Sequence, residues 1–81
     1  MESMDLIKAA ITTVEPAKAA KLGGVKLDTE IRSLGMDSVA TMEMVSYLEE
    51  QLHTTFPDEA LTEINTFGDL VKLIDRTKAA G

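Results

Sequence analysis

The chain of 81 residues is long enough for one small domain, and a domain of that size buries only about 60% of the surface that its unfolded chain exposes. A core this thin leaves little room for a water-excluded active site, and the absence of cysteine excludes disulfides and thiolate metal sites. The net charge is −6, and all eight Lys and Arg residues lie outside residues 33–71, a segment with eight acids that disfavours nucleic acid as a partner.

Neither a membrane-spanning helix nor a secretory signal is predicted from the sequence. No apolar run approaches the roughly 20 residues of a membrane-spanning helix. The N-terminal stretch MESMDLIKAA has two acids before its first lysine, which is atypical of a secretory signal. We therefore expect a cytoplasmic protein with no membrane partner, in which residues 1–81 form a single domain.

The first expected element is an amphipathic helix that begins near Ser3, whose hydroxyl can cap it. Its apolar residues recur at helical spacing: Leu6, Ile7, Ala10, Ile11 and Val14. Pro16 ends this pattern or opens a new turn. The next stretch, PAKAAKLGG, has high helix propensity but almost no apolar stripe, and we expect Gly23 and Gly24 to stop it.

Residues 25–36 are expected to form a loop that completes a long connection after the first helix. Four apolar side chains are expected to hold this loop against the core: Val25, Leu27, Ile31 and Leu34. Because a loop of nearly 20 residues is unusual in a compact domain, we expect a helical turn within Thr29–Ser33.

The stretch SLGMDSVATMEMVSYLEE predicts a second long helix that starts at Asp37. The Asp37 carboxylate can accept a hydrogen bond from the amide of Ala40, as helix caps do. At about 100° per residue, one face is expected to be core: Met42, Val45, Leu48 and Leu52. The opposite face mixes acids with apolar side chains: Val39, Ala40, Glu43, Ser46, Tyr47 and Glu50. Such a face is typical of a partner-binding surface, and also of a partly buried helix edge.

Two further helices are expected in FPDEALTEINTFGDLVKLIDRTKAA. Pro57 suits the first turn of a short helix with three apolar positions: Ala60, Leu61 and Ile64. Thr66 and Asp69 resemble a capping box for a last helix that runs to about Lys78. No alternating strand pattern occurs. The chain is therefore predicted to be an all-α four-helix bundle with three longer helices, one short helix and a long loop after the first.

Catalytic and metal-binding patterns are weak. GMDSV resembles the G-x-S-x-G turn of hydrolases, but the second glycine and the preceding strand are missing. The only histidine, His53, would lie about four turns from Ser38 on a helix, out of hydrogen-bond reach. The acid pairs Glu49-Glu50 and Asp58-Glu59 lack the spaced ligands of a calcium loop. We expect no catalytic residue and no resident metal.

Ser38 is the residue whose position needs an explanation. With Asp37 in the capping position, the Ser38 hydroxyl is left to point outward. A helix N-terminus favours phosphate through its dipole and its free amides. The neighbouring Asp37 charge opposes a phosphodiester slightly, which suggests that a divalent metal takes part when such a group is attached.

LGMDSV, the acidic helix after it and FPDEALTEINTFGDLVKLI together resemble the acyl carrier protein family over essentially the whole chain. The resemblance implies a four-helix bundle that is not an enzyme. It implies that a phosphopantetheinyl transferase, using coenzyme A and magnesium, attaches 4′-phosphopantetheine to Ser38, and that the arm carries acyl groups as thioesters. It also implies ketosynthase, acyltransferase and other synthase partners with basic docking patches, for a carrier that we expect to be monomeric.

Carried over residue by residue, the resemblance implies two sets of contacts around Ser38. The partner face would comprise Asp37, Val39, Glu43, Tyr47, Glu49, Glu50 and Asp58. An acyl pocket is expected along the seam between the second long helix and the short helix: Met42, Met44, Val45, Leu48, Leu61 and Ile64.

Departures from the family pattern bear on the pathway. Val39 stands where leucine is usual, Ala40 where fatty-acid carriers often have another acid, and Tyr47 adds an exposed aromatic side chain. These departures favour polyketide or other specialised pathways over primary fatty-acid synthesis, and Asp37 disfavours the peptidyl branch. The hypothesis from a different class is an unmodified acidic helical adaptor that binds a basic partner protein.

Overall fold

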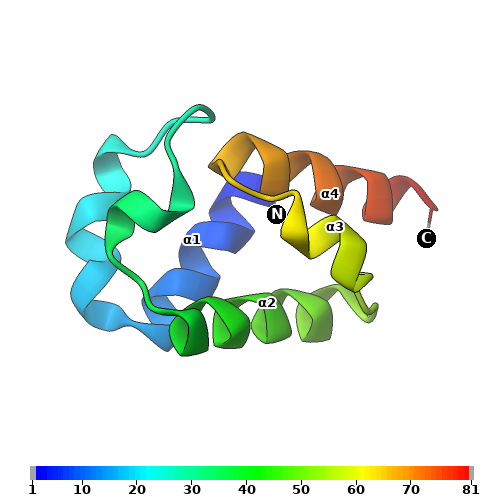
Figure 1. Ribbon diagram of the computed structural model, residues 1–81, viewed down its shortest axis with the longest axis horizontal. Helices are drawn as coiled ribbons and strands as arrows, with labels where there is room; N and C mark the ends of the chain where they lie inside the picture. The colour runs from blue at the N-terminus through cyan, green and yellow to red at the C-terminus, as the bar shows by residue number, and fades with distance from the viewer. Residues whose placement is uncertain (1, 81) are drawn as a thin grey trace.

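The computed structural model describes the backbone of residues 2–80 and the side-chain burial of residues 2–79. This part of the chain contains α1 (Ser3–Val14), α2 (Ser38–Leu52), α3 (Asp58–Thr62) and α4 (Phe67–Ala80). Two 3₁₀ helices, η1 (Pro16–Gly24) and η2 (Ile31–Leu34), occupy much of the connection between α1 and α2 (Figure 1). The predicted bundle of three longer helices and one short helix is confirmed.

The connection after α1 is more helical than expected. The stretch 16–24 forms 3₁₀ turns opened by Pro16, and its two glycines lie in its last turn instead of after it. Leu22 is its only buried side chain, so the core holds η1 through one anchor. The turn expected within Thr29–Ser33 occurs slightly later, as η2, and ends at Gly35 with a left-handed φ of 78°.

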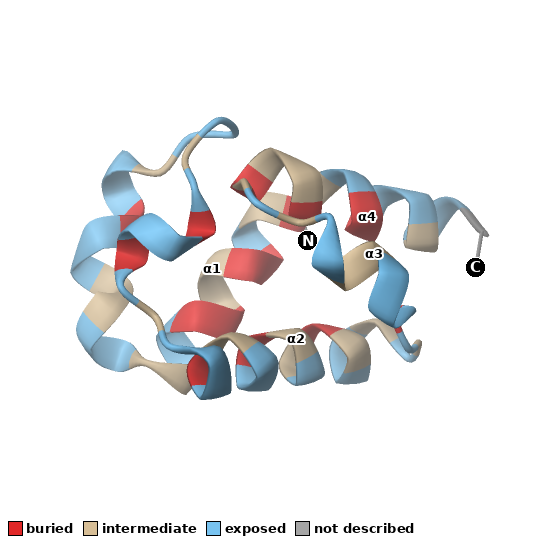
Figure 2. Ribbon diagram, viewed as in Figure 1, coloured by how far each residue is buried: buried red, intermediate tan, exposed pale blue. Residues whose placement is uncertain are grey.

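The core forms around α1, which contacts α2, α4 and η1 (Figure 1). The buried side chains of α1 and α4 include Leu6, Ile7, Ala10, Ile11, Phe67, Leu70, Leu73 and Ile74. Figure 2 shows that the buried positions of α1, α2 and α4 face a shared interior. α3 has no buried residue, so it is the element with the fewest apolar anchors.

The loop before η2 is tied to the start of α4 by its backbone. The amides of Gly68 and Phe67 donate to the carbonyls of Leu27 and Thr29 at 2.7 and 3.0 Å, and the Ile31 amide donates to the Asn65 carbonyl at 2.9 Å. These bonds flank an isolated antiparallel bridge between residues 30 and 66, and the described residues form no strand. The prediction that the Leu27 side chain is an anchor is wrong, because Leu27 is 58% exposed. Leu27 helps to hold the loop through its carbonyl and not through its side chain.

Gly68→Ala should destabilise the fold. A Cβ atom at Gly68 would lie 2.8 Å from the Leu27 carbonyl oxygen, which is backbone and is already held by a hydrogen bond. Relieving that overlap must displace the loop from α4, and overpacking of this kind costs roughly 1–3 kcal/mol. Chemical denaturation measures the change in the free energy of unfolding. Gly23→Ala is the matched control, because its Cβ would meet nothing within 4 Å. Equal stability of the two variants would contradict the close approach.

The inward face of α2 differs from the predicted one. Ala40, Met44 and Leu48 are its buried residues, whereas Met42 is 70% exposed and Val45 and Leu52 are half-buried. The prediction of Met42 as core and of Ala40 as exposed is therefore wrong. Met44 sits one turn after Ala40 and one turn before Leu48, so these three residues form a stripe as regular as the predicted one.

The predicted helix caps have mixed outcomes. The Asp37 cap is confirmed, since its Oδ1 accepts from the Ala40 amide at 2.8 Å. The capping box is confirmed as well, with mutual hydrogen bonds of 3.1 Å between the side chains and amides of Thr66 and Asp69. The Ser3 cap is wrong: Glu2 holds the capping position of α1, and the buried Ser3 hydroxyl donates to the Asp75 carboxylate of α4.

The stabilising effect of Asp69 should depend on pH. Hydrogen bonds from the amide of Asn65, and then from that of Thr66, hold the pKa of the Asp69 carboxyl below its ordinary value of 3.8. A depressed folded-state pKa gives stability that is present above 3.8 and is lost as the pH falls through the folded pKa. The difference in unfolding free energy between wild type and Asp69→Asn should therefore narrow below that pH. A difference that stays constant between neutral pH and acid would contradict this role.

Candidate functional site

Ser38 is the first residue of α2, and its side chain is exposed. Its hydroxyl makes no hydrogen bond within residues 2–79, because Asp37 supplies the cap of the helix. The first amides of an α-helix have no partner inside the helix and carry a partial positive charge. The site thus offers an accessible hydroxyl next to donors that suit an anionic group.

An exposed strip of α2 continues from this hydroxyl along the helix. Val39 is 65% exposed, and Glu43 and Glu50 lie on the same side of the helix, also exposed. Together with Val14 of α1 and with Met42, Ser46 and Tyr47, they line a shallow groove of about 410 Å³. We call Val39, Met42, Glu43 and Glu50 the outer strip of α2. It combines two apolar side chains with two acids, and Tyr47 borders it half-buried.

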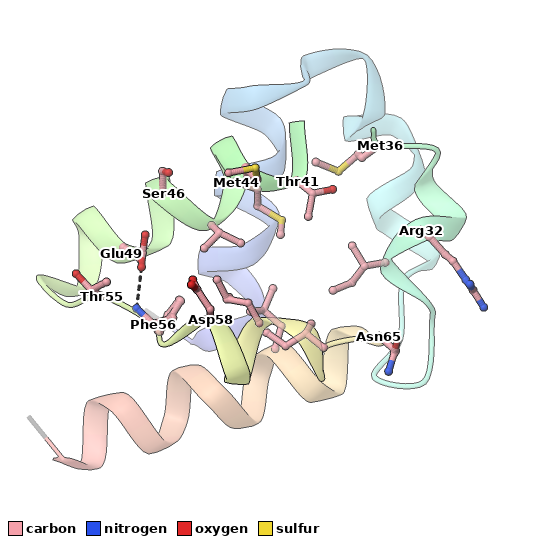
Figure 3. A pocket seen from close by; sticks show the side chains of 16 residues that line it. Arg32, Met36, Thr41, Met44, Ser46, Glu49, Thr55, Phe56, Asp58 and Asn65 are labelled. Atoms are coloured by element: carbon pink, nitrogen blue, oxygen red, sulfur yellow. Dashed lines mark hydrogen bonds between the residues drawn. The ribbon is translucent and has the colours of Figure 1, made fainter. Parts of the chain in front are cut away.

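The other acids expected at the partner face lie in different settings. Asp37 and Asp58 are exposed. Glu49 is half-buried, and its Oε2 accepts from the Phe56 amide at 2.7 Å, which fixes the turn between α2 and α3 (Figure 3). Its carboxylate therefore has one oxygen engaged within the chain, unlike the acids of the outer strip.

A cavity of about 520 Å³ opens between α2, α3 and η2. Five of the six residues expected at an acyl pocket line it: Met42, Met44, Val45, Leu61 and Ile64. Leu48 does not line it, and its side chain is fully buried in the core. Met36 and Thr41, two residues before and three after Ser38, also line the cavity (Figure 3). The cavity thus begins within about one helix turn of the serine hydroxyl.

Further residues complete the lining of the cavity, among them Glu49 and Asp58 of the expected partner face. Ile31, Phe56 and Leu70 close the apolar floor, while Ser46, Thr55, Asp58 and Asn65 make the rim polar. Arg32 is also at the rim, but Figure 3 shows its side chain pointing away from the cavity, and it pairs with Glu30 at 2.9 Å. Phe56 could have been found from FPDE, where an apolar side chain precedes a helix that has few anchors of its own.

The described residues hold no arrangement suited to hydrolysis or to a metal ion. His53 is exposed at the C-terminal cap of α2, with a left-handed φ of 54°. No group of three or more His, Asp or Glu side chains within residues 2–79 could hold a metal ion. No helix in the described part of the chain is long and apolar enough to span a membrane.

Comparison with known proteins adds two similarities. The family described as "Phosphopantetheine attachment site" matches residues 5–74, which include most of α1, the outer strip and α3. An acyl carrier protein of Prochlorococcus marinus (strain MIT 9515) is 35% identical over 79 residues, which cover 96% of this chain and 99% of the relative.

Proposed function

The chain belongs to the acyl carrier protein family, non-catalytic carriers of covalent 4′-phosphopantetheine, and we propose that Ser38 is the residue that bears this arm here. The observation that carries the proposal is the exposed Ser38 hydroxyl, without a partner, at the first residue of a helix that Asp37 already caps. A serine needed for capping would have its oxygen engaged by the backbone. This one is left available for chemistry.

The residues around Ser38 suit the attachment of a phosphodiester. In loading, the Ser38 oxygen forms a bond to the phosphorus atom of coenzyme A that bears the pantetheine, the pyrophosphate bond at that atom breaks, and adenosine 3′,5′-bisphosphate and the hydroxyl proton are released. The free amides of the first turn of α2 stabilise the negative charge by about 0.3–1 kcal/mol. The Asp37 carboxylate opposes it, which is consistent with the use of magnesium by the transferase. When bound, the arm supplies the thiol on which acyl groups are held as thioesters.

Intact-protein mass spectrometry tests the proposal. The chain is incubated with coenzyme A, magnesium and a phosphopantetheinyl transferase of broad specificity, and the mass should rise by that of one arm. Fragmentation of the product should place the added mass on Ser38. An unchanged mass would favour the alternative function of an unmodified acidic adaptor.

We propose that the outer strip of α2 and Asp58 are the docking surface for the transferase and for synthase enzymes with basic patches. The acids there are exposed and unpaired within the described residues, and no Lys or Arg lies between Ser33 and Val71 to neutralise them. Val39 and Met42 supply apolar area between the charges. Exposed charges steer the encounter of two proteins more than they stabilise the fold.

Glu43→Lys should slow loading several-fold and leave the unfolding free energy nearly unchanged. The reversed charge repels a basic partner surface, and the wild-type rate should fall as salt screens the attraction. Loading is followed by mass over time at low and high salt. Asp28→Lys is the matched control, since Asp28 is exposed in the loop before η2 and far from the strip along the chain. A Glu43→Lys rate equal to that of Asp28→Lys, with no salt dependence, would contradict the docking surface.

We further propose a role in polyketide or another specialised pathway. Val39 at the exposed start of the strip and Tyr47 at its border support this assignment. Ala40 adds less than its sequence position suggested, because it is buried and does not face a partner. Extension assays with polyketide and fatty-acid ketosynthases separate the two pathways. We also propose that residues 1–81 act as one domain, as a monomer in the cytoplasm.

A further inference from the structure

The ammonium group of Lys18 lies beside Gly35, in the short segment that leads to Ser38 and contains no Lys or Arg. No Lys or Arg occurs between Ser33 and Val71, and Arg32, just before that span, is paired with Glu30, so an unpaired positive charge near Ser38 must come from elsewhere in the sequence. η1 supplies it: the Lys18 Nζ lies 3.3 Å from the point where a Cβ atom of Gly35 would stand. Gly35 has a positive φ of 78°, and the missing side chain leaves the ammonium group room against the backbone.

The Lys18 side chain has no counter-ion in the described part of the chain. Lys18 is half-buried, and Glu15, the acid just before η1, does not pair with it. The Glu15 carboxylate is itself turned inward, with a buried Oε2 that has no hydrogen-bond partner. An ammonium group without a counter-ion is stabilised by an anion that comes within reach.

We propose that Lys18 binds the phosphodiester that joins the arm to Ser38, an inference that rests on the attachment proposed above. Ser38 is three residues after Gly35, and three residues of chain span at most about 11 Å. The Lys18 ammonium group lies at one end of that interval and Ser38 at the other. Lys18 and the first amides of α2 then contact the phosphate together, and this fixes the base of the arm while its thiol end stays mobile.

NMR of the holo protein tests this contact. In wild type, the ammonium resonance of Lys18 should move between the apo and holo forms, whereas that of the exposed Lys26 should not. Lys18→Gln should displace the phosphorus resonance of the arm. Lys26→Gln removes the same charge from an exposed loop position and should leave that resonance in place. Added salt should reduce the difference between the variants, because it screens the ion pair.

The outcomes separate this inference from the function on which it rests. Identical phosphorus resonances in wild type and both variants, or a Lys18 resonance that does not move in protein loaded on Ser38, would overturn the inference alone. A chain that gains no arm, or gains it at another residue, overturns both, and mass spectrometry detects that before any spectrum is recorded.

Discussion

Ser38→Ala should abolish loading with phosphopantetheine while leaving the fold intact. The substitution removes an exposed hydroxyl that makes no hydrogen bond within the described residues, and Asp37 keeps its cap on the Ala40 amide. Surface substitutions of this kind usually change stability by less than about 0.5 kcal/mol. The loss of loading is expected to be complete, because no other group replaces the oxygen that forms the bond to phosphorus. Intact mass after exhaustive incubation measures it.

Ser33→Ala is the matched control for this variant. Ser33 is exposed in η2, five residues before Ser38, and its hydroxyl donates to the Glu30 carbonyl at 2.6 Å. Its loss should lower stability slightly and leave loading at the wild-type level. A mass gain by folded Ser38→Ala equal to that of wild type would move the attachment to a different residue.

The helix order and the caps of α2 and α4 follow from local rules that a sequence displays. Asp37 and the pair of Thr66 and Asp69 act through hydrogen bonds that span only three residues, so their spacing alone predicts them. The burial of Leu6, Ile7, Ala10 and Ile11 follows equally from one unambiguous stripe.

The buried face of α2 is harder to predict, because its apolar residues form two overlapping stripes. Met42 and Val45 continue one stripe toward Leu48, and Ala40 and Met44 continue the other. Periodicity predicts a helix from either stripe, but it cannot show which stripe is buried. The choice depends on how α2 packs against α1, which is tertiary information. The prediction that Leu48 lines the acyl pocket is wrong, because its side chain packs in the core away from the cavity lining.

Contacts between segments that are far apart in the sequence cannot be predicted from local patterns. The hydrogen bond from the Gly68 amide to the Leu27 carbonyl joins two parts of the chain through backbone atoms, which carry no sequence signal. In the sequence, Lys18 is one of two lysines in PAKAAKLGG with no sign of a special role. Only the fold of η1 brings it next to Gly35. Each of these features depends on the long connection after α1, where no apolar periodicity guides a prediction.

The cavity between α2 and α3 bears on where the cargo lies. Its volume of about 520 Å³ exists before any chain enters, so the cost of parting a close-packed core is reduced. The thioethers of Met36, Met42 and Met44 line it and can adapt to a guest by rotation. Burial of a saturated chain gains at most about 0.8 kcal/mol per methylene group. A chain of several carbons gains several such increments, and α3, which has no buried residue of its own, should move at low cost.

A saturated acyl chain should therefore enter the cavity, whereas a β-keto chain of equal length should stay largely outside. The ketone oxygens of the second cargo would lose their hydrogen bonds to water against an apolar floor made by Ile31, Phe56 and Leu70. Amide chemical shifts of the two loaded forms, each compared with the unloaded arm-bearing form, measure the difference. The saturated chain should move the amides of residues 42–45 and 61–64, and the polar chain should move them less.

The amides of Thr12 and Thr13 serve as the internal reference, because they lie on the exposed side of α1 and line no part of the cavity. They should stay unmoved with either cargo. Identical shifts for both cargoes, confined to the residues next to Ser38, would show that the cavity is not used and that the arm leaves its cargo in solvent. Shifts at residues 61–64 that scale with the number of methylene groups would instead tie the occupancy to apolar burial, since each added group contributes its own increment of about 0.8 kcal/mol.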